Sequence, residues 1–143
     1  MNKKITIIIV THNSRIKLPD CLASIYSQNY PKNLIKVIVI DNNSADSTIG
    51  YIQEKFPEVK LIKNKNNLGF AGGNNQGYYL AQKSQADYLF LANDDIILEF
   101  NCLSRLAKIL DQDSKIAAIQ PKLLLHPQTD KINSLGNSIH YLG

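Results

Sequence analysis

The chain has 143 residues, a length that suits a single domain with one hydrophobic core, and we expect one domain over residues 1–143. Sixteen Lys and Arg against twelve Asp and Glu give a formal net charge of +4, spread along the chain, which argues against a nucleic-acid-binding protein. There are only two cysteines, and the apolar run at residues 5–10 is too short for a signal peptide or a membrane span, so we expect a cytoplasmic protein.

Runs of β-branched and apolar residues predict five strands, at about residues 4–10, 35–40, 59–62, 87–92 and 116–120. Apolar residues at helical spacing follow the first, second and fourth of these runs. Ser44 is a candidate N-cap for the second helix, and a hairpin is expected between about residues 123 and 132. The alternation predicts an α/β fold with a mostly parallel sheet, helices on both faces, a central first strand, and residues 87–92 as a buried strand.

Polar residues follow the predicted strands at the points where they end. Asn93, Asp94 and Asp95 come directly after residues 87–92, where the carboxyl ends of parallel strands face ligands in open α/β sheets. Carboxylate oxygens suit Mg²⁺ or Mn²⁺, which one or two acids hold together with the phosphates of a substrate. A solvated Asn-Asp-Asp turn is the alternative interpretation.

Asp41 ends the second predicted strand and is followed by Asn42, Asn43 and Ser44. An acid at this place binds a ribose in dinucleotide folds, so a nucleoside contact is one interpretation and a turn residue is the other. His12 follows the first strand, but the sequence offers it no soft metal-ligand partners nearby, so we do not expect it to bind a metal.

The segment Gly69-Phe70-Ala71-Gly72-Gly73-Asn74-Asn75 is rich in glycine and asparagine. A helix that begins near Gly72 would direct its unpaired N–H groups toward an anion such as a diphosphate. The glycines follow the third strand and not the first, so the segment is not a dinucleotide fingerprint.

Taken in order, the strand-end motifs Thr11-His12-Asn13, Asp41-Asn42-Asn43-Ser44, Asn67 to Asn75 and Asn93-Asp94-Asp95 resemble those of the family 2 glycosyltransferases, which have a GT-A fold. The N-x-G-F-A-G-G-N-N form of the glycine-rich segment and the Pro121-Lys122-Leu123-Leu124 run are similar to those of its rhamnosyltransferase-type members. The resemblance covers nearly the whole chain and implies a Rossmann-like sheet, truncated at its C-terminus.

The resemblance implies a transferase that moves a sugar from a UDP- or dTDP-sugar to a glycan or lipid-linked acceptor, in the synthesis of cell-surface polysaccharide. Its implied metal, Mg²⁺ or Mn²⁺, would be held at the D-x-D-like position, where Asn93 replaces the first acid, by Asp95 and Asp94. The residues implied for the nucleotide sugar are Thr11, Asn13, Asp41, Asn43, Gly72, Gly73, Asn74, Asn75, Asn93 and Asp94.

The acid that serves such inverting enzymes as catalytic base has no counterpart after Asn133, and Asp130 suits a turn better than a base. We therefore expect the base beyond Gly143 and expect this portion alone to be inactive. Peripheral membrane association and self-association remain open. The competing interpretations are a non-catalytic nucleotide-binding or assembly module and, less well supported, a sugar-phosphate nucleotidyltransferase, which would need an Arg-bearing glycine-rich loop after the first strand.

Overall fold

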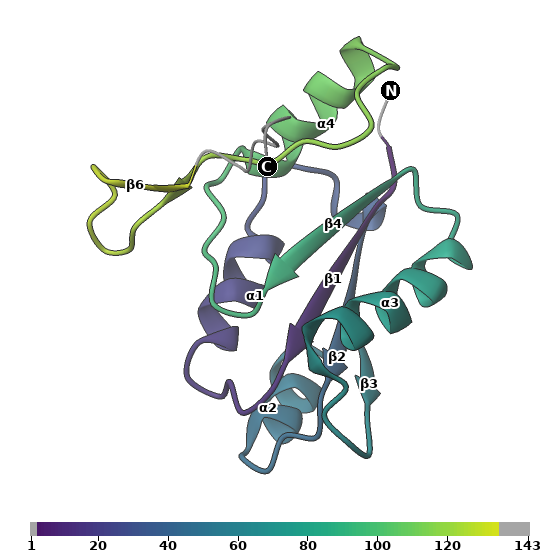
Figure 1. Ribbon diagram of the computed structural model, residues 1–143, viewed down its shortest axis with the longest axis vertical. Helices are drawn as coiled ribbons and strands as arrows, with labels where there is room; N and C mark the ends of the chain where they lie inside the picture. The colour runs from purple at the N-terminus through teal and green to yellow at the C-terminus, as the bar shows by residue number, and fades with distance from the viewer. Residues whose placement is uncertain (1–2, 135–143) are drawn as a thin grey trace, which may run out of the picture. The chain divides into compact units, whose positions relative to one another are not determined.

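A computed structural model describes residues 3–134 of the chain. The chain divides into two compact units, Met1–Asn101 and Cys102–Gly143. The first unit is an α/β sheet with its helices (Figure 1). Its elements in chain order are β1 (Ile5–Thr11), α1 (Leu18–Tyr26), a short 3₁₀ helix η1 (Lys32–Leu34), β2 (Ile35–Asp41), α2 (Thr48–Lys55), β3 (Lys60–Lys63), α3 (Gly69–Gln82) and β4 (Tyr88–Asn93). Four of the five predicted strands are therefore confirmed to within about one residue at each end.

The four strands form one parallel sheet in the order β3-β2-β1-β4, so the first strand is interior as predicted. The chain moves outward from β1 to β2 and β3, then crosses back to place β4 on the other side of β1. This reversal makes the space between the carboxyl ends of β1 and β4 a topological switch point, where open α/β sheets bind ligands.

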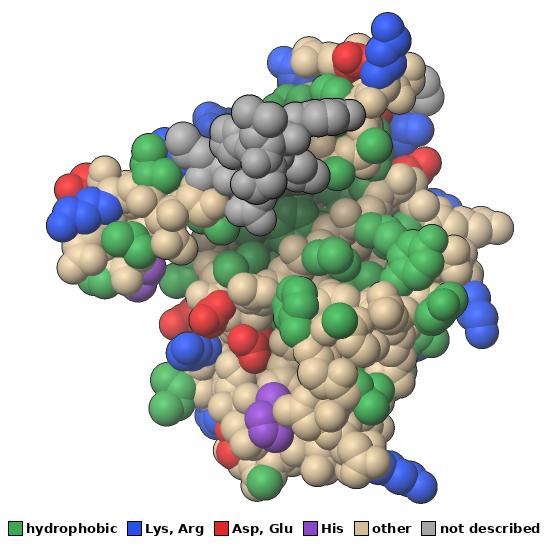
Figure 2. All heavy atoms as spheres, in the orientation of Figure 1, with side chains coloured by type: hydrophobic (Ala, Val, Ile, Leu, Met, Phe, Trp, Pro, Cys, Tyr) green, Lys and Arg blue, Asp and Glu red, His purple; other side chains and the backbone are tan. Residues whose placement is uncertain are grey.

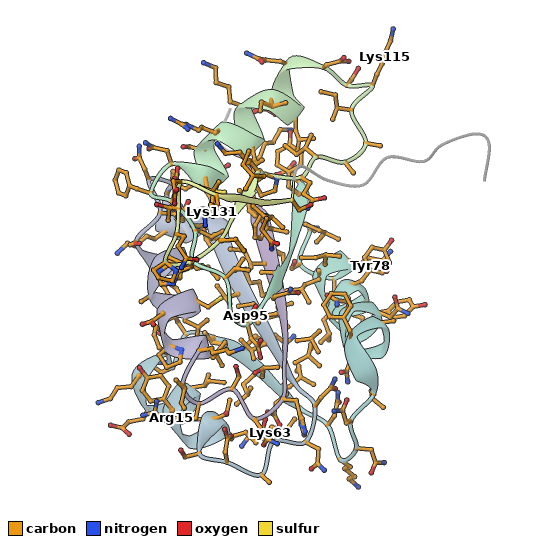
Figure 3. The ribbon with its side chains drawn as sticks, turned by 60° about the vertical axis from the view of Figure 1, so that its left-hand side comes forward. Arg15, Lys63, Tyr78, Asp95, Lys115 and Lys131 are labelled. Carbon is orange, nitrogen blue, oxygen red and sulfur yellow. The ribbon has the colours of Figure 1, made fainter. Side chains whose placement is uncertain are left out.

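Helices cover the sheet on both faces, as predicted: α1 and α2 lie on one side and α3, which carries Tyr78, on the other (Figure 3). On the α3 side the buried residues Ile8, Ile38, Ile40 and Ala81 form a core cluster. Two glycines bring α3 close to β1, since a Cβ on Gly73 would lie 2.7 Å from Val10 Cγ1 and one on Gly77 would lie 2.4 Å from Ile8 Cγ2. These glycines are therefore required by helix–strand packing.

The expectation that residues 87–92 form a buried strand is wrong. Leu89 is 41% exposed and Leu91 is 57% exposed, whereas Ala92 is buried. β4 is the end strand of the described sheet, and α3 lies mainly over β1 and β2, so the α3 side of β4 is left uncovered. Figure 2 shows hydrophobic side chains exposed over β4 beside α3.

The predicted cap of the second helix is also wrong, because α2 begins at Thr48 and not after Ser44. Asp46 Oδ1 accepts a hydrogen bond from the Thr48 backbone N–H at 2.9 Å, while the Ser44 hydroxyl accepts one from the Asn13 N–H. The third helix begins at Gly69, three residues before the expected start, and Gly69 has a positive φ of 70°.

The second unit contains α4 (Cys102–Gln112) and an antiparallel pair, β5 (Leu123–Leu124) and β6 (Ile132–Ser134), which confirms the predicted helix and hairpin. The predicted fifth strand at 116–120 is not formed, because no strand in the described part of the chain pairs with it and a strand exists only through its ladder. Within residues 3–134 no helix has the length and apolar character needed to cross a membrane.

Candidate functional site

The carboxyl ends of β1, β2 and β4 bring several predicted site residues to one edge of the sheet. Thr11 is the register partner of Asp41, and Val10 is the partner of Asn93. The acids after β4 therefore lie next to the end of β1, and Asp41 lies on its other side. In Figure 2 acidic side chains gather just beyond the end of β4, with a basic side chain beside them.

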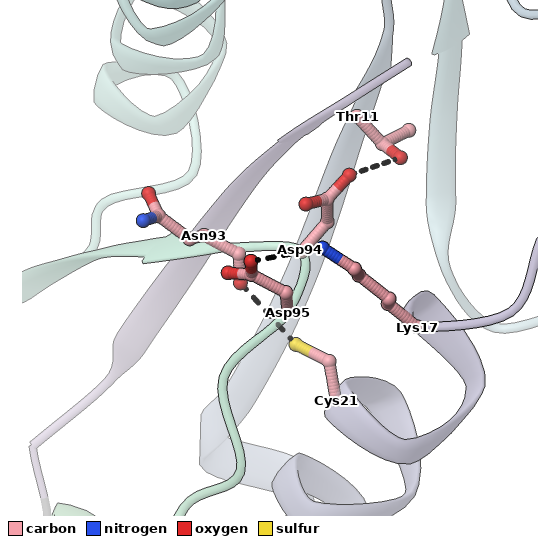
Figure 4. A network of polar contacts seen from close by, with 6 residues as sticks. All are labelled: Thr11, Lys17, Cys21, Asn93, Asp94 and Asp95. Atoms are coloured by element: carbon pink, nitrogen blue, oxygen red, sulfur yellow. Dashed lines mark hydrogen bonds and ion pairs between the residues drawn. The ribbon is translucent and has the colours of Figure 1, made fainter. Parts of the chain in front are cut away.

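Three side chains, one from β1, one from the residue before α1 and one from α1, contact the acid turn, which we define as Asn93, Asp94 and Asp95 (Figure 4). The Thr11 hydroxyl donates to Asp94 Oδ2 at 2.7 Å. Lys17 Nζ lies 3.4 Å from Asp95 Oδ2, and the Cys21 thiol donates to the Asn93 carbonyl at 3.5 Å. The acid turn is thus linked both to the end of the central strand and to one face of α1.

The Cys21 side chain is fully buried beneath the acid turn. Burial, with the negative charges of Asp94 and Asp95 as smaller causes, raises the pKa of this thiol from 9.0 to about 12. The thiol therefore stays protonated at neutral pH and keeps its hydrogen for the Asn93 carbonyl. It supports the turn and is not a nucleophile.

Asp41 is fully buried at the end of β2, although it carries a carboxylate. Its Oδ2 accepts the Ser44 backbone N–H at 3.1 Å, whereas its Oδ1 has no hydrogen-bond partner. A buried oxygen without a partner is unusual and costly in a native structure. The Oδ1 atom is thus a hydrogen-bond acceptor without a donor, and the nucleoside contact of Asp41 stays a prediction.

Asn13 has a positive φ of 53° and joins the loops that follow β1 and β2. Its side-chain oxygen accepts the backbone N–H groups of Ala45 at 2.8 Å and Asp46 at 3.4 Å. Its amide therefore shapes the loop after β2 from within. The His12 ring pairs with the Asn42 carbonyl at 2.9 Å, which gives this ring a structural role in the same loops.

Side-chain amides connect the end of β2 with the start of α3. We call Asn42, Asn64 and Gln76 the amide network. Asn42 Nδ2 donates to the Gly69 carbonyl, and Asn64 Nδ2 lies 3.0 Å from both Asn42 Oδ1 and Gln76 Oε1. The Asn64 backbone N–H also donates to the Asp41 carbonyl at 2.8 Å. The network fixes the glycine-rich segment relative to the Asp41 strand end.

The predicted residues of the glycine-rich segment differ in their surroundings. Gly73 faces Val10, and Gly72 approaches Leu68, where an added Cβ would lie 2.9 Å from the Leu68 Cβ. Asn74 is 9% exposed; its Nδ2 donates to the Phe70 carbonyl at 2.9 Å and its Oδ1 is buried without a partner. Asn75, like Asn43 in the loop after β2, is exposed to solvent.

The acid turn suits an open metal site and not a closed one. Within the described residues no group of three or more His, Cys, Asp or Glu side chains is placed to hold a metal ion. Proteins nevertheless often bind Mg²⁺ through only one or two carboxylates, while substrate phosphates and water supply its other ligands. Asp94 and Asp95 therefore fit a metal that binds together with a phosphate-bearing ligand.

Several residues that shape the site were not predicted as site residues, namely Lys17, Cys21, Asn42, Asn64 and Gln76. Lys17 and Cys21 are four residues apart and so share a helix face, a spacing that is visible in the sequence. Which face meets the acid turn depends on the packing of α1 against the sheet. The amide network joins positions 42, 64 and 76, and no local pattern connects these.

A parallel, doubly wound sheet with paired acids at its switch point places the chain among the Rossmann-like α/β proteins, which bind ligands at this edge of the sheet. The sequence model of Glycosyl transferase family 2 matches residues 6–124, and the chain belongs to this family.

Two curated relatives act on poly(ribitol-phosphate). The chain is 30% identical to a beta-glucosyltransferase of Bacillus spizizenii over 97 residues, which are 66% of this chain and 15% of the relative. It is 26% identical to the beta-N-acetylglucosaminyltransferase TarS of Staphylococcus aureus over 120 residues, which are 83% of this chain and 21% of the relative. The chain thus spans about a fifth or less of the length of these relatives.

Solved structures share the fold. The structure of S. aureus TarS 1–349 in complex with UDP has a TM-score of 0.64 and 20% identity, covering 87% of this chain and 43% of that one. A mannosyltransferase from Pyrobaculum calidifontis in complex with GDP-Man and Mn²⁺ has a TM-score of 0.69 and 22% identity, covering 77% of this chain and 33% of that one. The predicted family and fold are therefore confirmed.

Proposed function

We propose that this chain binds the donor of a glycosyltransferase reaction, a nucleoside-diphosphate sugar of the UDP or dTDP type, together with Mg²⁺ or Mn²⁺. The TarS complex with UDP and the mannosyltransferase complex with GDP-Man and Mn²⁺ support a nucleotide-sugar donor and a divalent metal. The acceptor would be a glycan or lipid-linked glycan of the cell surface, as the two poly(ribitol-phosphate) transferases suggest.

Asp95 and Asp94 are the proposed metal ligands. Asp95 is the better placed of the two, because one oxygen of Asp94 is already bonded to the Thr11 hydroxyl and the Asp95 side chain is 46% exposed. When bound, the metal would act as a Lewis acid that neutralises charge on the departing nucleoside diphosphate. Asn93, which replaces the first acid of the motif, would contribute an amide toward the sugar or ribose.

Asp41 is the proposed acceptor for a donor group on the nucleoside, with Thr11 and Asn13 shaping the same strand ends. The observation that carries this assignment is the fully buried Asp41 carboxylate with one oxygen lacking a partner, next to Thr11 in register. The segment Gly72 to Asn75, with Asn43 across the loop, would line the base and diphosphate side of the ligand.

The test is the metal dependence of nucleotide binding. UDP, dTDP and GDP are titrated into the 143-residue chain by calorimetry with and without Mn²⁺. We expect Mn²⁺ to strengthen binding of at least one of them, and Asp95→Ala to abolish that gain without changing the far-ultraviolet circular dichroism. Unchanged metal-assisted binding in Asp95→Ala would refute the assigned role of Asp95.

We further propose that the base for inverting transfer is not supplied by the described residues. Asp130 is exposed in the loop between β5 and β6, where the Lys131 N–H donates to the Gln128 carbonyl as in a turn. Donor binding without sugar transfer to any acceptor is therefore expected of the 143-residue chain, assayed with radiolabelled donor. Robust transfer by the chain alone would refute this part of the proposal.

We also propose a cytoplasmic location, because the chain has only two cysteines and disulfide-rich sequences are typical of oxidising compartments. A cytoplasmic donor site would have direct access to nucleotide sugars. If the acceptor is lipid-linked, we propose that the protein acts at the inner face of the membrane.

A further inference from the structure

Lys17 is the basic side chain that contacts the acid turn. It immediately precedes α1, and its Nζ lies 3.4 Å from Asp95 Oδ2, with the two side chains 65% and 46% exposed (Figure 4). Cys21, one helical turn later on the same face, contacts the Asn93 carbonyl. Two contacts from one helix face thus direct this end of α1 toward the acids.

The backbone of Lys17 is fixed while its side chain is free to move. Leu18 and Cys21, which follow Lys17 in the first turn of α1, are buried, and the Leu18 N–H donates to the Ser14 carbonyl at 3.0 Å. The lysine side chain is a flexible chain of four methylene groups, and at Lys17 most of its surface is exposed to solvent. The ammonium group can therefore leave Asp95 without any change in the fold.

The charges at the acid turn make such a movement necessary when a metal binds. Asp94, Asp95 and Lys17 together carry one net negative charge, so the lysine weakens the attraction for a cation. A divalent ion bound to Asp95 would repel an ammonium group held a few ångströms away. Arg15, in the same loop, has its guanidinium 3.9 Å from the Tyr51 ring centroid and so is engaged elsewhere.

We propose that Lys17 is a displaceable cation of the donor site. It neutralises Asp95 in the metal-free protein, and when a divalent ion takes Asp95 the ammonium group turns to a phosphate oxygen of the donor diphosphate. This inference rests on the proposed function and adds to it a residue that couples the binding of metal and nucleotide.

The proposal predicts effects of opposite sign from one substitution. Lys17→Met removes the competing cation, so Mn²⁺ alone should bind about 2- to 5-fold more tightly, the range expected for an exposed ion pair. The same change removes a charged contact to the diphosphate, so UDP, dTDP or GDP in saturating Mn²⁺ should bind about 3- to 10-fold more weakly. A role in structure alone would move both affinities in one direction.

The experiment measures free Mn²⁺ by electron paramagnetic resonance and nucleotide affinity by calorimetry. Lys17→Arg keeps the charge and should retain the wild-type pattern. Lys36→Met is the matched control for net charge, since Lys36 is exposed near the beginning of β2, at the opposite edge of the sheet from the acid turn. It should leave both affinities within twofold of wild type.

Two results would overturn the proposal. One is a Mn²⁺ affinity of Lys17→Met that equals that of Lys36→Met, and the other is an unchanged nucleotide affinity in Mn²⁺. Failure of the proposed function looks different: the wild-type chain would then bind no Mn²⁺, or Asp95→Ala would bind it equally well, and the Lys17 proposal would fall with it.

Discussion

The two sides of the carboxyl edge are built in different ways. The Asp41 side is buried and internally bonded: the Asn42 backbone donates to the Thr11 carbonyl, the Asn64 backbone donates to the Asp41 carbonyl, and side-chain amides join both to α3. The acid turn is more exposed, and its carboxylates are held by one hydroxyl and one mobile lysine. The Asp41 side is therefore fully formed in the folded protein, whereas the acid turn keeps its carboxylates accessible to solvent.

This difference has a physical reason. Under the proposed function, a nucleoside presents neutral hydrogen-bonding groups at fixed positions, and a rigid, desolvated acceptor such as Asp41 would recognise these best. A metal–diphosphate pair brings its own charges and ligands, so carboxylates that remain hydrated until it arrives avoid the cost of burying unpaired charge. We therefore interpret the Asp41 side as preformed and the acid turn as completed by the ligand.

The largest effect should come from Asp41→Asn. Loss of one charged hydrogen bond should weaken nucleotide binding about 10- to 100-fold, while Mn²⁺ binding stays unchanged. Because the substitution also removes a buried carboxylate with an unpaired oxygen, the free energy of unfolding should stay the same or rise. Calorimetry and urea unfolding measure the two quantities.

Asp87→Asn is the matched control for Asp41→Asn. Asp87 accepts the Lys4 backbone N–H at 2.8 Å at the opposite edge of the sheet, and this bond together with the charge of Lys3 lowers the pKa of its carboxyl group. The variant should lose stability and keep nucleotide affinity. The same profile in both variants would show that Asp41 has no special role in binding.

Gly77→Ala should lower the free energy of unfolding by about 2 kcal/mol, because a Cβ there would lie 2.4 Å from Ile8 Cγ2 on the central strand. Gly50→Ala in α2, where nothing lies within 4 Å of the added Cβ, should raise it by about 0.5–1 kcal/mol through helix propensity. Urea unfolding of both variants tests the contrast. Equal effects at the two sites would contradict the close packing of α3 on β1.

Asn64→Ala should cost about 1 kcal/mol of stability and weaken nucleotide binding severalfold, because it frees the start of α3 from the end of β2. Asn66→Ala, an exposed neighbour, is the control and should change neither quantity. Thermal unfolding and calorimetry provide the measurements. If Asn64→Ala lost stability but kept full nucleotide affinity, the amide network would have no role in nucleotide binding.

The smallest effect at neutral pH belongs to Cys21. Its pKa is raised by burial, so the folded state holds the thiol proton more tightly than the unfolded state does. The resulting stabilisation is complete below pH 9 and declines as the pH rises toward about 12. The free energy of unfolding of the wild type should therefore fall more steeply over this pH interval than that of Cys21→Ala. Parallel plots of this free energy against pH for the two proteins would contradict the assigned burial.

Much of this organisation could be predicted from the sequence because it depends on local pattern. The β-branched runs located β1 to β4, and the polar residues after them located Thr11, Asp41 and the acid turn. The strand predicted at 116–120 failed because pairing depends on a partner distant in the sequence. The exposure of Leu91 was missed for a related reason, since it depends on where α3 lies and not on the strand's own composition.

The site residues divide in the same way. Asp94 and Asp95 are recognisable by residue type and position, whereas Lys17 and Gln76 gain their roles from contacts made 78 and 12 residues away in the chain. Gly72 and Gly73 were predicted as residues that bind the nucleotide sugar, and at Gly73 the structure identifies a close approach of α3 to Val10. Composition reveals that small residues are required but not which neighbour requires them.

Hydrogen exchange of the backbone amides, followed by mass spectrometry with and without Mg²⁺ and the best-binding nucleotide, tests the preformed and ligand-completed sides directly. In the free protein, peptides covering residues 41–46 should exchange slowly, because the N–H groups of Asn42, Ser44 and Ala45 all donate within the fold. Peptides covering residues 93–97 should exchange quickly and become protected only with ligand. Protection of residues 93–97 in the free protein would contradict the view that the ligand completes the acid turn. So would ligand-induced protection that is confined to residues 41–46.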